Sequence, residues 1–327
     1  MIITKTPFRI SFVGGGSDLE AFYSQAEGAV ISTSINKYMY ITTHRFFDPD
    51  KIQLKYSKTE TLNTIGEIQH PIFREVFKKF GIAGGLEATS VADIAAGTGM
   101  GSSSTFTVGL LHNLYVRQNR FVTKEQLAEE ACEIEIVKLS EPIGKQDQYA
   151  ASFGGLNVIR FLKEGNVLVE PLHIEKSLNQ AFQSHLLLFY IGSQRSASSI
   201  LSEQKKNTSE ADKHRTLSEM VDMVFEFRKN LYQGNLESVG KLLHHNWQLK
   251  QQLASGITNP MIDQIYTTGI KAGAWGGKLL GAGGGGFMLF MCPPEKQNDL
   301  KKELSKLRLF DFKFEQEGSK VIHVEEE

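Results

Sequence analysis

The sequence has few cysteines, almost no net charge and no long apolar run. Its 327 residues include two cysteines, Cys132 and Cys292, and 36 Lys and Arg against 37 Asp and Glu. Cys132 lies in a helical pattern and Cys292 ends an apolar run, so we expect two buried free thiols rather than a disulfide. The net charge of −1 argues against nucleic-acid and membrane partners, which a clustered basic excess would indicate.

Segments that could cross or enter a membrane are also missing. The most apolar runs, residues 186–191 and 287–292, are much shorter than the roughly 20 residues that a spanning helix needs. The N-terminus leads directly into a strand pattern and lacks the layout of a signal peptide. We therefore expect a cytoplasmic protein.

What the sequence does have is enough apolar material for a large core. Hydrophobic residues make up 41% of the chain, and its length exceeds the usual size of one compact domain. Strand-rich and helix-rich stretches follow one another without a repeat or an obvious linker. The pattern predicts two closely joined α+β domains, residues 1–175 and 176–327.

The positions of the elements follow from apolar periodicity and from turn residues. The expected strands are residues 9–13, 29–35, 38–46, 52–56, 86–92, 156–161, 167–172, 186–191, 274–280, 286–291 and 320–324. The expected helices are residues 71–80, 103–118, 124–139 and 295–307, with a largely helical stretch over 197–271 that is broken near Asn207, Gly234 and Gly256.

Three segments are dense in glycine: residues 14–16, 97–101 and 281–286. The last fits the dinucleotide-binding fingerprint, but that fingerprint needs a helix after it, and a strand-like run over 287–291 follows instead. A Rossmann site is therefore rejected. A Walker A loop is absent as well, since Leu279 stands where that motif requires Ser or Thr.

The middle segment lies between an expected strand and an expected helix. In residues 97–104, here called the 97–104 loop, glycines allow close approach of the backbone, and the first N–H groups of the helix are unpaired. These donors and the helix dipole favour a bound anion, and serine hydroxyls could reach a phosphate or Mg²⁺. An ordinary helix cap beside a flexible loop is the alternative.

Carboxylates after this helix add a second candidate feature. Several glutamates occupy residues 124–139, and most of them are expected on a solvated helix face. Asp147 follows a glycine turn and is flanked by Lys145 and Gln148. It is a candidate base or metal-organising group, and a simple turn or cap residue is the alternative.

With these residues in view, the chain resembles the GHMP kinase superfamily, named for galactokinase, homoserine kinase, mevalonate kinase and phosphomevalonate kinase. Its three motifs appear in order, at residues 7–18, 97–104 and 278–286, with Gly-x-x-Asp-Gln at 144–148 between the last two. The resemblance spans nearly the whole chain. It implies an N-terminal domain like the second domain of ribosomal protein S5 and a ferredoxin-like C-terminal domain.

The resemblance also implies an ATP-dependent kinase with Mg²⁺ as cofactor. Ser103 and Glu135 would ligate the metal, Asp147 would orient or deprotonate the acceptor hydroxyl, and Arg9 would act beside it. The ATP phosphates would be held by Gly97, Gly99, Met100, Gly101, Ser102, Ser103 and Ser104. The substrate would be bound by Gly15, Gly16, Ser17, Asp18, Gly283 and Gly284.

Within the family, residues 14–18 and 190–197 resemble the branch that acts on D-glycero-D-manno-heptose 7-phosphate. That branch phosphorylates the anomeric (C1) hydroxyl and gives the 1,7-bisphosphate, on the way to nucleotide-activated heptose for surface glycans. The alternatives are an anomeric kinase for an unphosphorylated sugar (fucose- or galactose-like) and a non-catalytic ligand sensor on the same fold.

A sugar that already carries a phosphate needs cationic or N–H partners away from ATP. Arg195 is a candidate, beside Ser193 and Ser196, and a surface arginine at a helix start is its alternative. Lys145 is a weaker second candidate. The sequence leaves a homodimer open.

Overall fold

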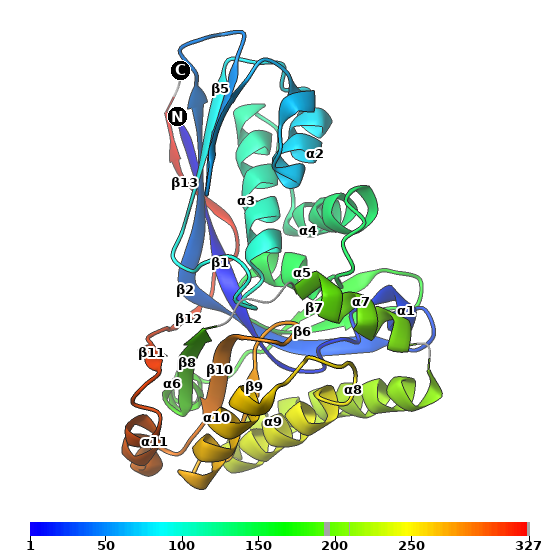
Figure 1. The fold of residues 1–327 in the computed structure, drawn as a ribbon, viewed down its shortest axis with the longest axis vertical. Coiled ribbons are helices and arrows are strands. Elements are labelled where there is room, and N and C mark those ends of the chain that lie inside the picture. Colours follow the sequence, from blue (N-terminus) through cyan, green and yellow to red (C-terminus); the bar gives the residue numbers. More distant parts are fainter. Residues whose placement is uncertain (193–196, 209, 326–327) are drawn as a thin grey trace.

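The computed structural model describes residues 1–192, 197–208 and 210–325, and its described strands form two sheets (Figure 1). The larger sheet has the order β13-β1-β2-β5-β3-β4, with β6 and β12 also paired to β2 and β7 paired to β6. Its strands are β1 (Ile2–Val13), β2 (Gly28–Arg45), β3 (Ile52–Lys55), β4 (Thr59–Leu62), β5 (Leu86–Ala92), β6 (Leu156–Phe161), β7 (Val167–Pro171), β12 (Phe314–Glu315) and β13 (Lys320–Val324). The smaller sheet, of order β11-β8-β10-β9, consists of β8 (Leu186–Gly192), β9 (Gly276–Leu279), β10 (Gly286–Met291) and β11 (Arg308–Phe310).

One group of helices lies beside the larger sheet, and a later group packs on the smaller sheet and on the end of the larger one (Figure 1). Those that follow the first strands are α1 (Glu20–Tyr23), α2 (Pro71–Phe80), α3 (Ser102–Arg117), α4 (Lys124–Cys132), a π-helix (Glu133–Lys138) and α5 (Gln146–Phe153). The later ones are α6 (Lys176–Ser184), α7 (Ala197–Asn207), α8 (Ala211–Tyr232), α9 (Leu236–Lys250), α10 (Pro260–Lys271) and α11 (Gln297–Glu303).

Helix α2 shows how local signals set an element. Its apolar residues recur every three or four positions and are all buried, Pro71 opens it, and Gly81 ends it in the left-handed conformation at φ 63°. The expected bounds of this helix, and those of β5, β6, β10 and β13, are confirmed. The expected breaks in the 197–271 stretch separate α7, α8, α9 and α10.

Strand β2 differs from the expectation of two separate strands. It runs through 18 residues, pairing with β6 over its first part and with β5 over its second. The register against β1 shifts between Pro7 and Arg9, and β12 pairs with β2 at Ile35 and Ser34. Such an irregularity bends a strand and turns its side chains, and Arg9 lies at this bend.

The two ends of the chain meet in the larger sheet. β13 pairs with β1 antiparallel, and β12 pairs with β2, although both strands follow the whole smaller sheet in sequence. The expected division between residues 175 and 176 stays a prediction.

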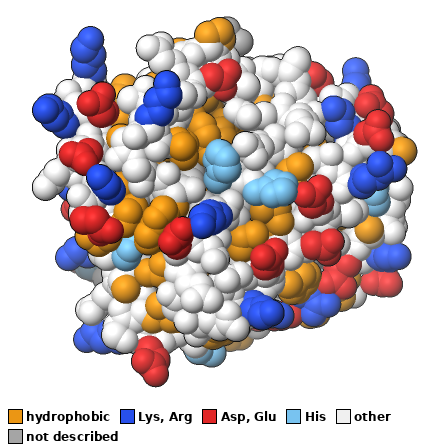
Figure 2. Space-filling model, turned by 90° about the horizontal axis from the view of Figure 1, so that it is seen from below, with side chains coloured by type: hydrophobic (Ala, Val, Ile, Leu, Met, Phe, Trp, Pro, Cys, Tyr) orange, Lys and Arg blue, Asp and Glu red, His pale blue; other side chains and the backbone are white. Residues whose placement is uncertain are grey.

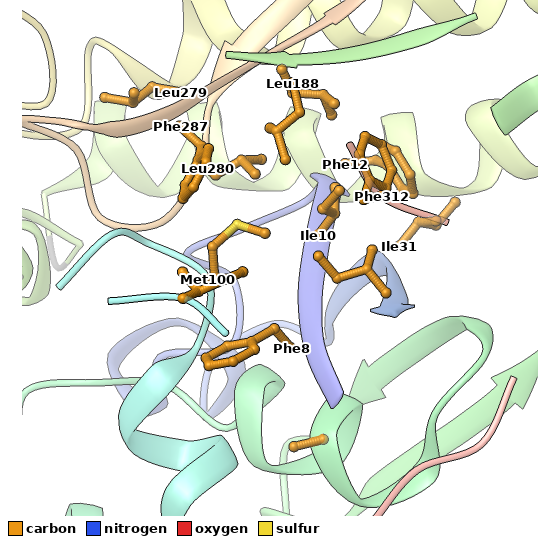
Figure 3. Packing of buried hydrophobic residues seen from close by; sticks show 14 of the residues in the cluster. Phe8, Ile10, Phe12, Ile31, Met100, Leu188, Leu279, Leu280, Phe287 and Phe312 are labelled. Atoms are coloured by element: carbon orange, nitrogen blue, oxygen red, sulfur yellow. The ribbon is translucent and has the colours of Figure 1, made fainter. Parts of the chain in front are cut away.

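One hydrophobic core extends across both sheets. Figure 3 shows Phe8 and Ile10 of β1, Met100 of the 97–104 loop and Phe287 of β10 packed around the same region. Both cysteines are free and buried, as expected. This shared core fixes the 97–104 loop against the loop that precedes β10.

The surface agrees with the balanced composition. On the face in Figure 2, acidic and basic side chains are interspersed, with apolar side chains between them. Among the described residues, no helix is long and apolar enough to cross a membrane.

Candidate functional site

The 97–104 loop leads into α3 through a series of left-handed glycines. Gly97, Gly99 and Gly101 have φ values of 75°, 80° and 78°, a region that residues with a Cβ adopt at a cost. Gly101 is the N-cap of α3, and no side chain caps this helix start. The first N–H groups of α3 are therefore available to an anion.

Residues 281–286, here called the 281–286 loop, pack directly on this first loop. A Cβ at Gly281 would lie 2.3 Å from Gly99 Cα, and one at Gly286 would lie 2.3 Å from Thr98 O. A Cβ at Gly99 would in turn lie 2.3 Å from Leu280 O. Glycine is required here because the two loops touch main chain to main chain. β10 follows, which confirms that this segment is not a Rossmann fingerprint.

Arg9 and Asp147 form a bidentate ion pair, here called the Arg9–Asp147 pair. Arg9 Nε and Nη2 donate to the two carboxylate oxygens, each at 2.7 Å, and Nη1 donates to Gly99 O, also at 2.7 Å. A Cβ at Gly101 would lie 3.2 Å from Asp147 Oδ2. The pair therefore lies at the end of the 97–104 loop.

Helix α5 brings Asp147 to this position from its first turn. Sequence patterns indicated a glycine turn there but no helix, because α5 is short and begins with polar residues. The glycine turn indicated by the sequence does precede Asp147 directly.

Glu135 is a buried carboxylate beside the start of α3. Its oxygens accept hydrogen bonds from Ser103 Oγ at 2.5 Å and from Gln148 Nε2 at 2.8 Å. Burial raises the pKa of Glu135 to about 7, against the lowering effect of its hydrogen bonds with Ser103, Ser104 and Gln148.

The expected helix over 124–139 has two parts, and this division places Glu135. After α4 the backbone widens into the π-helix Glu133–Lys138. A π-turn inserts an extra residue and changes the direction of the following side chains, so the buried Glu135 faces Ser103 while its neighbour Glu133 stays exposed to pairing with Lys79 and Lys138.

This donor set fits Mg²⁺ in the way that phosphoryl-transfer sites hold it. Among the described residues, no group of three or more His, Cys, Asp and Glu could enclose a metal. Mg²⁺ needs no such cage, since one or two carboxylates together with phosphate oxygens suffice. Glu135 and Ser103 offer one carboxylate and one hydroxyl next to the anion-accepting helix start.

A second pocket, the aromatic pocket, opens beside Gly97, Ser102 and Ser103. Its walls include Tyr56 and His70, whose ring centroids are 4.9 Å apart. Apolar side chains of the lining include Met39, Ile72, Ile94, Phe106 and Leu139. Flat apolar walls next to a phosphate loop suit a planar base. Sequence patterns gave no indication of this pocket because its residues come from five separate elements.

The central pocket includes the Arg9–Asp147 pair in its lining and shares no lining residue with the aromatic pocket. Besides the pair, it is lined by Ser11, Gly15, Gly16, Asp18, Leu19, Ile143, Gly144, Gln146, Leu201, Gln204, Lys250, Lys278, Gly281 and Ala282. Asp18 accepts hydrogen bonds from the backbone of Gly16 at 3.0 Å and of Gln146 at 3.3 Å. Burial, and then the charge of Asp147, raise the pKa of Asp18.

Two buried lysines in the central pocket were missed in the sequence. Lys250 Nζ donates to Gly281 O at 2.6 Å, and Lys278 Nζ donates to Phe12 O at 2.9 Å. Burial lowers the pKa of Lys250 to about 8 and that of Lys278 well below its usual value. A signal existed for Lys250, because it continues the buried face of α9 that includes Leu243 and Trp247.

Some residues predicted for the substrate do not line the central pocket. The Ser17 hydroxyl binds Gly14 O and Ala29 O, so it holds its own loop. Gly283 and Gly284 pack on Ile257, since a Cβ at Gly283 would lie 2.6 Å from Ile257 Cα and Gly284 N donates to Ile257 O at 3.1 Å. These glycines shape the 281–286 loop rather than the pocket.

Three further candidates also have other surroundings. The Met100 side chain packs in the core (Figure 3). Lys145 Nζ donates to Gly165 O at 2.6 Å and lies over the Tyr23 ring, away from the central pocket. Arg195 lies outside the described residues.

Comparisons with known proteins agree with this arrangement. A sequence model described as "GHMP kinases N terminal domain" matches residues 65–155, and one described as "GHMP kinases C terminal" matches residues 227–307. Together they cover more than half of the chain. The first match contains the 97–104 loop, Glu135 and Asp147, and the second contains Lys250 and the 281–286 loop.

Two curated relatives match along almost their whole length. A D-glycero-alpha-D-manno-heptose 7-phosphate kinase of Campylobacter jejuni is 29% identical, with 98% of each chain covered. A galactokinase of Pyrococcus furiosus is 26% identical, with 90% of each chain covered.

Solved structures share the fold. A D-glycero-D-manno-heptose 1-phosphate kinase from Bacteroides thetaiotaomicron superposes with a TM-score of 0.80 at 21% identity, covering 100% of both chains. A structure described as a putative sugar kinase from Campylobacter jejuni superposes with a TM-score of 0.79 at 27% identity, covering 99% of this chain and 98% of the other.

Proposed function

The chain belongs to the GHMP kinase family, and from that premise we propose that it phosphorylates the anomeric hydroxyl of D-glycero-D-manno-heptose 7-phosphate. The phosphoryl donor is ATP, and the product is the 1,7-bisphosphate, a precursor of nucleotide-activated heptose for surface glycans. The observation that carries the proposal is the contact between the end of the 97–104 loop and the Arg9–Asp147 pair. A phosphate on that loop would face a fixed carboxylate.

Asp147 orients the acceptor hydroxyl and takes its proton in this proposal. The acceptor oxygen forms a bond to the γ-phosphorus, the bond from that phosphorus to the bridging oxygen of ADP breaks, and the hydroxyl proton passes to the Asp147 carboxylate. Arg9 fixes the carboxylate through two hydrogen bonds and ties it to Gly99 of the loop. Positioning of this kind accounts for much of the catalysis in phosphoryl transfer.

The nucleotide spans the 97–104 loop and the aromatic pocket. Main-chain N–H groups at the start of α3 and the hydroxyls of Ser102 and Ser103 face its phosphates, and the base lies against Tyr56 and His70. Ser103 and Glu135 would hold Mg²⁺, which neutralises charge on the phosphates when bound. In the absence of a cation, the hydrogen bond from Ser103 keeps the Glu135 side chain in place.

The central pocket receives the sugar. Asp18 presents a buried carboxylate for sugar hydroxyls, Gly15 leaves space in the pocket, and Gly16 donates its N–H to Asp18. The identity of the sugar rests on the likeness to the Campylobacter jejuni heptose 7-phosphate kinase over the whole chain and on the motif at residues 14–18. Arg195 remains our candidate partner for the phosphate already on the sugar. A cytoplasmic location also stays a prediction.

A panel of acceptors with coupled detection of ADP tests the proposal. We expect the highest kcat/KM with D-glycero-D-manno-heptose 7-phosphate, and a rise in KM for this acceptor alone in Arg195→Ala. Turnover with galactose, fucose or mevalonate but not with the heptose phosphate would overturn the assignment of the sugar. ATP binding without turnover of any acceptor would instead support a ligand sensor.

A further inference from the structure

Lys250 is a buried ammonium group with unused hydrogen-bond donors. Its exposed fraction is 6%, and within the described part of the chain its hydrogen bond is the one to Gly281 O, at 2.6 Å. An ammonium group carries three N–H donors, so two remain without a protein acceptor. Burial of a charge with unmet donors costs several kcal/mol, and a bound anion would recover part of this cost.

The contacts of Lys250 place it close to the Arg9–Asp147 pair. Gly281, which accepts its hydrogen bond, touches Gly99, and Gly99 O accepts a hydrogen bond from Arg9. Lys250 of α9 and Arg9 of β1 thus each donate a hydrogen bond to one of the two touching glycines. Lys250, Arg9 and Asp147 all line the central pocket.

The space in front of Lys250 is bounded by polar atoms that lack partners. A Cβ at Gly15 would lie 4.0 Å from Lys250 Nζ, 3.8 Å from Ser11 Oγ and 3.9 Å from Gln146 Nε2. Ser11 Oγ and Gln146 Oε1 are buried and form no hydrogen bond with the described residues. A side chain at Gly15 would fill this space, and glycine leaves it open to an oxygen-rich ligand.

Arg9 keeps one N–H donor on each Nη after its contacts with the described residues. Three of its five N–H donors are engaged, two by Asp147 and one by Gly99 O. During transfer, the phosphoryl group carries negative charge on its three equatorial oxygens. Enzymes that transfer phosphoryl groups stabilise this charge with cations. Lys250 adds a second positive charge and two further N–H donors, and, whereas Lys278 donates to Phe12 O, Lys250 donates to Gly281, the glycine that touches the 97–104 loop.

We propose that Lys250 is a second cationic catalytic residue, which donates hydrogen bonds to the phosphoryl group as it passes from ATP to the acceptor oxygen. This inference rests on the proposed kinase function and deepens it. Lys250 exchanges no proton in the step, since the hydroxyl proton goes to Asp147. Its stabilising contact is strongest in the transition state, where the phosphoryl group lies between the loop and the pocket.

Two other roles for Lys250 predict different kinetics. A tether that only holds the 281–286 loop would need a hydrogen-bond donor but no charge. A partner for a phosphate already on the sugar would affect KM for phosphorylated acceptors and leave other acceptors unchanged.

Lys250→Met, Lys250→Gln and Lys250→Ala separate these roles, with Lys241→Met as control. Lys241 lies on the same helix with 69% of its side chain exposed. We expect kcat to fall about 10²- to 10³-fold in Lys250→Met and Lys250→Gln, as for loss of one transition-state donor. The KM values for ATP and acceptor should stay within about threefold, and ethylammonium should partly restore kcat in Lys250→Ala. Lys241→Met should match the unmodified protein.

The measurement uses the acceptor that gives the highest rate, so it does not depend on the sugar being the heptose phosphate. Retention of kcat within about tenfold in Lys250→Gln, whose amide can still donate to Gly281 O, would show a tether and overturn the proposal. A loss confined to KM for phosphorylated acceptors would also overturn it. Unfolding midpoints and the Kd of a non-hydrolysable ATP analogue confirm that each variant is folded, and ethylammonium rescue in Lys250→Ala supports the proposal even where Lys250→Met fails to fold.

Discussion

On the two sides of the proposed site, the 97–104 loop presents mainly main-chain groups to the ATP phosphates, whereas the central pocket presents buried side chains to the sugar. The 97–104 loop offers N–H groups from consecutive residues, held by three left-handed glycines. The central pocket gathers Asp18, Gln204 and Lys250 from three distant parts of the chain. The 97–104 loop lies in one stretch of sequence, whereas the central pocket exists only after folding.

The two sides also differ in how they manage charge. On the ATP side, helix-start donors attract an anion without burying a cation. On the sugar side, Lys250 and Lys278 are buried ammonium groups whose pKa values are lowered by loss of solvation. Buried ammonium groups lower the stability of the folded protein, so we expect them to be kept because they serve a function. Four predictions test this contrast.

Asp147→Asn, at the boundary between the two sides, should have the largest effect. We expect kcat to fall about 10³- to 10⁴-fold, because the amide cannot take the hydroxyl proton. The Kd for an ATP analogue should change by less than about twofold, since the loop itself is intact. Steady-state kinetics and calorimetry measure the two quantities. If kcat barely changed, the role assigned to Asp147 would be wrong.

Gly99→Ala should lower stability more than Gly97→Ala, which serves as its matched control. Both glycines have a positive φ, so each substitution costs about 1–2 kcal/mol of backbone strain. A Cβ at Gly97 meets nothing within 4 Å, while one at Gly99 would lie 2.3 Å from Leu280 O. Crowding should add about 1–3 kcal/mol in Gly99→Ala. Equal urea unfolding curves would contradict the tight contact between the two glycine loops.

Glu135→Gln should reduce activity and increase stability. The folded-state pKa of Glu135 is raised to about 7 from 4.5, so stability from its neutral form is present at low pH and lost as pH rises through 7. At pH 8 the uncharged variant avoids this loss, worth up to about 3 kcal/mol at 1.4 kcal/mol per pKa unit. Gln148 Oε1 has no hydrogen-bond partner among the described residues and can accept from the new amide.

The activity of the same variant should fall about 10- to 100-fold, through the loss of a carboxylate that binds the cation. Thermal unfolding without Mg²⁺ and initial rates at saturating Mg²⁺ measure the two effects. If the variant were less stable than the original protein at pH 8, burial of the ionised Glu135 carboxylate would not reduce the stability of the folded protein.

The pH profile should show the smallest of the four effects. kcat/KM should fall above pH about 8, tenfold per pH unit, as Lys250 loses its proton. The pKa of Lys250 is lowered because burial and the charge of Arg9 favour the neutral amine more than Asp18 and Asp147 favour the ammonium. Lys278 also faces it. Phosphates are ionised throughout this range.

Lys250→Arg is the control for this profile, since a guanidinium stays charged across the whole range. The fall above pH 8 should disappear in this variant, whatever its absolute rate. An unchanged fall would assign the titration to another group.

Much of the fold could be read from local patterns. Helix α2 and strand β5 carry their own start and stop signals, and their bounds matched expectation. The division of residues 124–139 into α4 and a π-helix could not be predicted, because it goes together with a contact across the fold, between Glu135 and Ser103. The pairing of β12 and β13 with the first strands is also a long-range contact without a local signal.

The site divides along the same line. Arg9 and Asp147 belong to recognisable motifs, Glu135 was assigned through the family resemblance alone, and the structure brings all three to the 97–104 loop. The Ser17 hydroxyl looked like a ligand because its motif neighbours face the pocket, but the tight turn needs it for Gly14 and Ala29. Lys250 was missed although it continues the buried face of α9, because a lysine in a helix is ordinarily solvated.

Phosphorus NMR of a completed reaction tests the central claim most directly. With ATP and D-glycero-D-manno-heptose 7-phosphate, we predict one new phosphate signal coupled to the anomeric proton, in an amount equal to the ADP formed, with the 7-phosphate retained. The signal should be absent with Asp147→Asn. Formation of ADP with inorganic phosphate alone, or a new phosphate on another carbon, would contradict the account.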